Sequence, residues 1–301
     1  MPLLDVQRFC RWIVTIVLAV LLLAACAPAG SGSQLTGSPS PSPSPAPART
    51  YTWMIAYSAV QRLEQVDPSD TLAKTYFDNA HTYLLGAGAP NFPTQWHSIP
   101  TVTFASYAAM QKAFASHTIP ASVKAVVYDN EAWSFTPAQE QRQPGRYDQL
   151  AAELVHEHHL IFIATPATDL AHVINPAGGN SYQNFLRLGI AGAAARYADI
   201  YEIQAQGSEL HTSTYVNFVR QAAEQARAAN AHVIVLAGLS TNPGGQHVTG
   251  EDLYRAVMAT QSMVSGYWLN IPAGGRYCPR CGTPQPQVAI DFLKRLSGQD
   301  Q

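Results

Sequence analysis

Short runs of β-branched and aromatic residues alternate with longer alanine-rich stretches along most of this chain, and this alternation limits the possible folds more than any other feature. The short runs lie at 52–58, 101–106, 123–131, 160–167, 198–206, 232–240 and 266–272. Helix-like patterns lie around 70–85, 106–116, 146–159, 181–196, 213–229, 250–264 and 286–297. A strand followed by a helix, repeated many times, is typical of parallel β/α units.

Seven such units in about 250 residues predict an α/β fold, a TIM-like (β/α)8 barrel with one irregular unit. An open, doubly wound parallel sheet is the alternative, although no GxGxxG follows the first predicted strand. Thr249, which precedes Gly250-Glu251-Asp252, indicates a helix start with acids in the first turn. We therefore expect residues 50–301 to form one barrel domain.

The amino-terminal end predicts export from the cell. Arg8 and Arg11 precede an apolar run that has the length of a signal-peptide core. The motif LAAC, which ends at Cys26, resembles the lipobox of bacterial lipoproteins, in which the cysteine is lipidated and becomes the first residue after cleavage. The resemblance implies a signal peptide at 1–25 and a lipid anchor in the outer face of the bacterial cell membrane. An ordinary secretory signal and an uncleaved anchor are the alternatives, and both still export the protein.

The segment 26–49 predicts a tether between the lipid and the folded domain. It alternates Ser with Pro and has almost no large apolar side chains that could offset the entropy of ordering. Proline-rich chain extends by about 3.1 Å per residue, so the tether would hold the domain roughly 60 Å from the membrane.

Cysteine usage fits an oxidising compartment. Cys10 would leave with the signal peptide and Cys26 would carry the lipid, so only Cys278 and Cys281 of the motif CPRC are available to the domain. Zinc needs about four ligands, and no second CxxC or HxxxH completes such a set. We therefore expect a short disulfide between Cys278 and Cys281.

Charge and motifs exclude several classes of partner. The chain carries 18 basic and 20 acidic residues, so it lacks the cationic footprint of a nucleic-acid binder. The glycine-rich loops NPAGGN and NPGGQ are not followed by GK[ST], and GxSxG is absent. We therefore expect no cofactor and no nucleic-acid partner, and the function has to be inferred from a site.

Polar and aromatic side chains gather where the predicted strands end. In a parallel barrel these ends meet on one face, so residues far apart in the sequence can line one pocket. Amide side chains bind sugar hydroxyls and aromatic rings stack on sugar faces, although the same residue types also serve as core or loop supports. The residues that we expect to contact a substrate are Tyr57, Trp133, Gln204, Gln206, Asn242, Trp268 and Asn270.

One strand, VVYDNEAW at 126–133, ends in two acids, Asp129 and Glu131. Alternation along a strand puts both acids on the face that Ala125 and Val127 continue into the barrel. Two carboxyls at this spacing lie within about 7 Å, and burial with mutual repulsion raises the pKa of one of them. A carboxyl that keeps its proton at neutral pH suits a general acid, whereas a purely structural pair would bind loop amides.

An apolar strand that ends in Asp-x-Glu at the mouth of a barrel resembles the catalytic strand of family 18 chitinase-like glycoside hydrolases. The resemblance implies that Glu131 protonates the glycosidic oxygen and that Asp129 orients the substrate's N-acetyl group, which acts as the nucleophile. It also implies that Trp268, on the last strand, forms the floor of the sugar site. This chain differs in that KAVV replaces part of the family's DxxDxDxE motif, and Tyr201, two strands later, is expected to point outward.

Two further patterns involve the strand that ends in Asp129 and Glu131. Glu202 is expected to point inward, so Glu131 and Glu202 offer a second glycosidase mechanism in which their separation decides between retention and inversion. The motif YDNEAW, followed by Thr136-Pro137, Glu140-Gln141 and Pro144, is similar to uncharacterised exported bacterial (β/α)-barrel lipoproteins. That second resemblance implies no particular activity.

The cluster His156-Glu157-His158-His159 contains metal-binding residue types, but its spacing is not HExxH. It ends a predicted helix just before a strand, which puts it on the barrel face opposite the acids. We interpret it as complementing the helix dipole and expect no metal site.

Together these patterns predict a lipid-anchored surface protein with a glycoside-hydrolase-like barrel, which hydrolyses a glycan with Glu131 as general acid. A surface lipoprotein that binds carbohydrate without turnover is the first alternative. A structural envelope protein without a ligand is the second.

Overall fold

The computed structural model describes residues 50–69, 71–87, 92–93 and 95–298. The predicted signal peptide, the lipidated Cys26 and the Ser/Pro-rich tether lie outside these residues. Within them, no helix combines the length and the apolar character needed to span a bilayer.

Eight parallel strands close into a barrel, in which each strand pairs with its neighbours in chain order and the last pairs with the first. The strands are β1 (Thr52–Ala56), β2 (Thr82–Ala87), β3 (Ile99–Phe104), β4 (Ala125–Tyr128), β5 (Ile161–Ala164), β6 (Ile200–Ile203), β7 (Ile234–Ser240) and β8 (Gly266–Asn270). This closure confirms the TIM-like barrel and excludes the open sheet.

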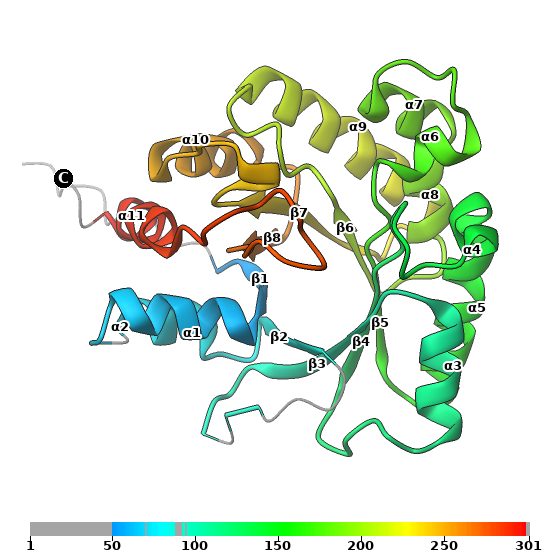
Figure 1. Cartoon of the computed structure of the whole chain (residues 1–301), viewed down its shortest axis with the longest axis horizontal. Helices are drawn as coiled ribbons and strands as arrows, with labels where there is room; N and C mark the ends of the chain where they lie inside the picture. Colours follow the sequence, from blue (N-terminus) through cyan, green and yellow to red (C-terminus); the bar gives the residue numbers. More distant parts are fainter. Residues whose placement is uncertain (1–49, 70, 88–91, 94, 299–301) are drawn as a thin grey trace, which may run out of the picture. The chain divides into compact units, whose positions relative to one another are not determined.

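Helices surround the strands, as Figure 1 shows. They are α1 (Tyr57–Val66), α2 (Thr71–Phe77), α3 (Tyr107–Ala115), α4 (Ala138–Arg142), α5 (Pro144–Glu157), α6 (Leu170–Ile174), α7 (Ser181–Arg187), α8 (Ile190–Ala195), α9 (Thr212–Ala229), α10 (Gly250–Thr260) and α11 (Pro286–Ser297), with a 3-10 turn at η1 (Pro243–Gly245). Thr249 starts α10 as predicted, because its side chain accepts from the Asp252 amide while the Asp252 side chain accepts from the Thr249 amide.

The strand that the sequence pattern missed is β2, because residues 70–85 were predicted to form one helix. In the structure α2 ends earlier and Asn79 turns the chain, since its Nδ2 donates to the Tyr76 carbonyl and its Oδ1 accepts from the His81 amide. The strand that follows is buried on both faces, so it lacks the alternation that reveals a half-exposed strand. Among the described residues no helix lies between β2 and β3, so this unit is the irregular one.

Other predicted boundaries also shift. The predicted helix at 181–196 is two helices, α7 and α8, separated at Gly189, whose φ is 68°. All predicted strands except the one that ends at 240 end two or three residues earlier than predicted; β1 ends at Ala56, so Tyr57 begins α1, and β4 ends at Tyr128. Asp129 and Glu131 therefore lie in the loop that begins at the mouth of the barrel.

The core has two layers, inside and outside the strands. The inner one is apolar and contains Met54, Tyr83, Leu85, Ala125, Val127, Ile163, Ile200, Leu236 and Trp268. The outer layer, between strands and helices, includes Tyr201 and Tyr267. Alternation along β6 thus puts Ile200 inside and Tyr201 outside, as predicted, and it turns Glu202 inward.

Candidate active site

Three neighbouring strands each place a polar side chain at the mouth of the barrel. Asp129, Thr165 and Gln204 are the first residues after β4, β5 and β6. Thr165 Oγ1 and Gln204 Nε2 each donate to Asp129 Oδ1, both at 3.0 Å. Gln204 Nε2 also donates to the Thr165 carbonyl at 2.9 Å. These bonds fix the Asp129 carboxylate in one orientation.

The surroundings of Asp129 and Glu131 raise the pKa of both carboxyls, which is the direction that a general acid requires. Burial raises the pKa of Asp129 to about 6, and the Thr165 hydrogen bond opposes a larger rise. Burial also raises the pKa of Glu131 well above its usual range, and the nearby carboxyls of Asp129 and Asp169 raise it further. Burial and the neighbouring carboxyls therefore favour the protonated form of Glu131, as a general acid requires.

Glu202 lies deeper than either of these acids. It points into the barrel as expected, but it is fully buried, and neither of its oxygens has a hydrogen-bond partner in the described part of the chain. Burial, with the negative charge of Asp129, raises the pKa of Glu202 well above its usual range. Because Glu202 exposes no surface to a substrate, the structure does not support the predicted carboxylate pair of Glu131 and Glu202. Glu202 is a buried carboxyl beneath the mouth instead.

A cavity of about 500 Å³ opens beside Asp129. The predicted substrate-contacting residues Tyr57, Trp133 and Trp268 all line it, and the other lining residues are Ala56, Ser58, Gln61, Leu85, Gly86, Thr103, Ala105, Asp129 and Tyr277. Its volume lies within the usual range for small-ligand sites. Aromatic side chains from α1, the β4 loop, β8 and the β8 loop thus surround one carboxylate.

Four predicted amide residues lie outside this lining: Gln204 donates to Asp129, as described above, and the other three have different positions. Gln206 lies over β7, where a Cβ on Gly238 would come within 2.3 Å of the Gln206 side chain, so the glycine makes room for it. Asn270 ends β8 and is half-buried. Asn242 is a correction: its Nδ2 donates to the backbone carbonyls of Pro272, Cys281 and Thr283, so it supports a loop instead of facing a substrate.

Asp169 and Tyr277 are site residues that sequence reasoning missed. Asp169 follows β5, its Oδ1 accepts from the Ala132 amide at 3.0 Å, and burial raises its pKa. An acid shortly after a predicted strand end is the signal that could have found it. Tyr277 precedes Cys278 in the loop after β8, and an aromatic residue in a disulfide-closed loop at the mouth of the barrel is the corresponding signal.

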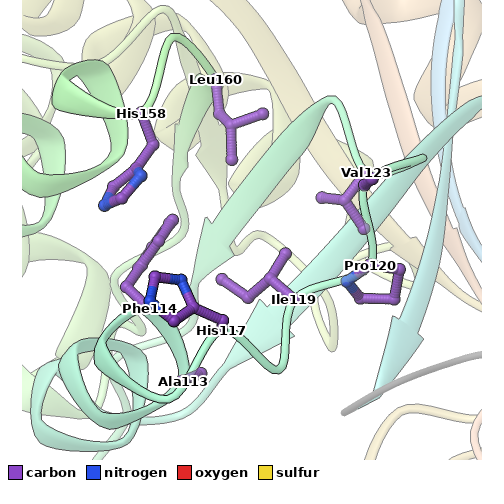
Figure 2. Close-up of a pocket in the computed structure, with 9 residues that line it drawn as sticks. Ala113, Phe114, His117, Ile119, Pro120, Val123, His158 and Leu160 are labelled. Atoms are coloured by element: carbon purple, nitrogen blue, oxygen red, sulfur yellow. The ribbon is translucent and has the colours of Figure 1, made fainter.

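The predictions for the CPRC motif and for the histidine cluster have different outcomes. The disulfide between Cys278 and Cys281 is confirmed. The histidine cluster lies at the other end of the barrel, where His158 and Phe114 line a surface crevice of about 260 Å³ (Figure 2). The described residues contain no group of three or more His, Cys, Asp or Glu side chains arranged to hold a metal ion.

Comparison with known proteins adds structural similarity only. No family model matches the chain, and no curated protein matches its sequence. A catalytic-site mutant of active domain 2 of the thermostable chitinase from Pyrococcus furiosus, solved with chito-oligosaccharides, has a TM-score of 0.49 at 10% identity, covering 85% of this chain and 97% of its own. The spore cortex-lytic enzyme SleL of Bacillus megaterium has a TM-score of 0.44 at 9% identity, covering 85% of this chain and 75% of its own.

An active-site mutant of the β-1,3-glucanosyltransferase of Rhizomucor miehei, solved with laminaritriose, has a TM-score of 0.42 at 10% identity, covering 80% of this chain and 97% of its own. Similarity at this level carries no argument about activity. The assignment of the fold rests on the closed parallel barrel itself, and the function has to be argued from the site.

Proposed function

We propose that this protein is an exported, lipid-anchored glycoside hydrolase that cleaves a glycan at the outer cell surface, with Glu131 as general acid. One observation carries the proposal: Asp129, close to Glu131, whose protonated form burial favours, forms part of the wall of an aromatic cavity at the mouth of the barrel. The anchor is proposed from LAAC and the Ser/Pro-rich segment 26–49.

In this mechanism the Glu131 carboxyl gives its proton to the glycosidic oxygen as the bond from that oxygen to the anomeric carbon breaks. The carbonyl oxygen of the substrate's N-acetyl group attacks the anomeric carbon, and the ionised Asp129 accepts a hydrogen bond from the N-acetyl N–H. Water then attacks the same carbon as the bond from that carbon to the N-acetyl oxygen breaks, and the water gives its proton to the Glu131 carboxylate, which restores the acid.

A carbohydrate-binding lipoprotein without turnover is the second candidate function. The observation in its favour is that Asp129 Oδ1 already accepts two hydrogen bonds from protein groups, from Thr165 and Gln204. A carboxylate held in this way supports a rigid binding pocket as well as a reaction.

A substitution at Glu131 separates these functions. The protein, Glu131→Gln and the control Glu153→Gln, on an exposed part of α5, are incubated with N-acetylglucosamine oligomers and with plain β-glucans. We expect wild type and the control to hydrolyse one class and Glu131→Gln to lose about 10³-fold in rate. Binding without product in all three proteins would identify a binding module, and unchanged hydrolysis by Glu131→Gln would exclude Glu131 as the acid.

A further inference from the structure

The loop after β8, residues 271–285, is anchored from several sides. The disulfide between Cys278 and Cys281 closes its tip. Asn242 Nδ2 donates to the carbonyl of Cys281 at 2.8 Å, and to those of Pro272 and Thr283 at 3.2 and 3.3 Å. One buried amide thus fastens both arms of the loop to the end of β7.

The two arms approach each other too closely for ordinary side chains. The Gly274 amide donates to the Gly282 carbonyl, and a Cβ on Gly274 would lie 2.9 Å from that oxygen. Cys278 accepts hydrogen bonds from the amides of Gly275 and Cys281 through its carbonyl. The loop therefore has a defined shape that the disulfide helps to maintain.

The tip of this loop meets the β4 loop in an aromatic cluster of Trp133, Phe135 and Tyr277. The ring centroids of Phe135 and Tyr277 are 4.8 Å apart, and those of Trp133 and Tyr277 are 5.9 Å apart. Arg276 Cζ lies 4.4 Å from the centroid of the Phe135 ring. Trp133 is itself fixed, because its Nε1 donates to Thr136 Oγ1 at 2.7 Å.

Tyr277 is 65% exposed although it packs in this cluster, and it lines the same cavity as Asp129. An exposed aromatic surface at the rim of a cavity is typical of ligand contact. The apolar face of a sugar ring suits such a surface, because it covers the ring while the hydroxyls stay in water.

We propose that Trp133, Phe135 and Tyr277 form an outer sugar-binding subsite for a glycan whose reactive end lies at Asp129 and Glu131, and that the disulfide keeps this subsite assembled. The inference rests on the proposed function and extends it. It assigns the loop after β8 a role in recognising the length of the glycan, so oligomers too short to reach Tyr277 gain nothing from it.

The test compares Tyr277→Ala with Tyr277→Phe, which keeps the ring, and with Tyr197→Ala, which removes an exposed tyrosine outside the cavity. Affinity is measured by calorimetry for oligomers of two to six N-acetylglucosamine or glucose units, with Glu131→Gln as the background to prevent turnover. We expect Tyr277→Ala to weaken binding of the longer oligomers about tenfold and to leave the dimer unchanged. The other two variants should bind like the background protein.

A second variant tests the role of the disulfide. Cys278→Ser combined with Cys281→Ser should show the same length-dependent loss as Tyr277→Ala, with the barrel still folded by circular dichroism. If this double variant binds long oligomers as tightly as wild type, the disulfide has no part in the subsite.

The outcomes also separate this inference from the proposed function. Two results would overturn the subsite and leave the proposed chemistry of Glu131 intact. In one, Tyr277→Ala binds long oligomers as tightly as the background protein does; in the other, it weakens binding equally for all lengths. If wild type neither binds nor cleaves any oligomer, the proposed function is wrong and the subsite is wrong with it.

Discussion

Both ends of the barrel carry ionisable side chains, but these are buried at the carboxyl ends of the strands and exposed at the amino ends. At the carboxyl ends of the strands, Asp129 is 8% exposed, has donors from two strands, and borders a cavity of about 500 Å³. At the amino ends, His156 and His158 are exposed, and His158 lines a crevice of about 260 Å³ (Figure 2). His156 Nε2 lies 2.9 Å from Asp199 Oδ2, and the His158 ring stacks on Phe114 with centroids 4.3 Å apart.

The difference shows that enclosure, more than residue type, distinguishes a candidate site. The histidine cluster contains more metal-binding and acid-base residue types than the mouth, yet its side chains face solvent. The carboxyls at the mouth are desolvated together, and their separation from water is what changes their proton affinity. The predictions below test whether this contrast holds.

The largest expected effect follows from Asp129→Asn. The proposed mechanism needs an ionised carboxylate at this position, so we expect this variant to lose about 10³-fold in kcat/KM, equivalent to about 4 kcal/mol. Since burial raises the pKa of Asp129 to about 6, wild-type activity should fall as the pH drops below that value. Asp129→Asn should lack this acidic limb in a pH–rate profile.

The control is His158→Ala at the other end of the barrel, which should keep both the wild-type rate and the acidic limb. A loss in His158→Ala as large as that in Asp129→Asn would mean that the chemistry involves the amino-end face, and the contrast between the two ends would be broken.

The sequence predicted those features of the fold that depend on residues close together along the chain. The barrel, the capping of α10 and the inward Glu202 follow from patterns within single elements, and they were predicted correctly. β2 was missed because a strand buried on both faces has no alternation, and Ala- and Leu-containing sequence around it reads as helix. The alternation of apolar and polar residues indicates which face of a strand is exposed, so it gives no signal where both faces of the strand are equally buried.

The sequence predicted the position of a candidate site residue where that position depends on its strand, and it failed where the position depends on a partner far along the chain. Asp129, Trp133 and Trp268 reach the cavity because their strands end there. Asn242 was assigned to substrate, but its amide is satisfied by carbonyls at least 30 residues away. No spacing within the sequence encodes that contact, because the closure of the barrel creates it.

A medium effect is expected from a buried carboxyl that belongs to neither end. Asp148 on α5 is fully buried behind the barrel near Tyr128 and Tyr201, and neither of its oxygens has a partner among the described residues. Burial raises its pKa to about 8. The folded state therefore keeps a proton that the unfolded state loses above about pH 4, so stability is greatest below that pH and falls as the pH rises towards 8.

Asp148→Asn should remove this dependence, which amounts to about 1.4 kcal/mol per pH unit, or about 3 kcal/mol between pH 5 and pH 7. Urea unfolding at both pH values measures it, and Asp291→Asn on an exposed part of α11 is the matched control. Activity should be unchanged, because Asp148 does not line the cavity beside Asp129. Loss of activity in Asp148→Asn would show that a buried carboxyl outside the mouth also serves the site, and would weaken the contrast drawn above.

The smallest effect is expected at the amino-end face itself. His158→Ala removes the ring that stacks on Phe114 and should lower the free energy of unfolding by about 0.5 to 1 kcal/mol. His156→Ala removes a contact with Asp199 in which both side chains are nearly half exposed, and should cost less, about 0.5 kcal/mol at most. Urea unfolding at pH 7, with unchanged m-values, measures both. Losses of several kcal/mol would mean that the histidines support the barrel as strongly as a core residue does, and that exposure alone does not distinguish the two ends.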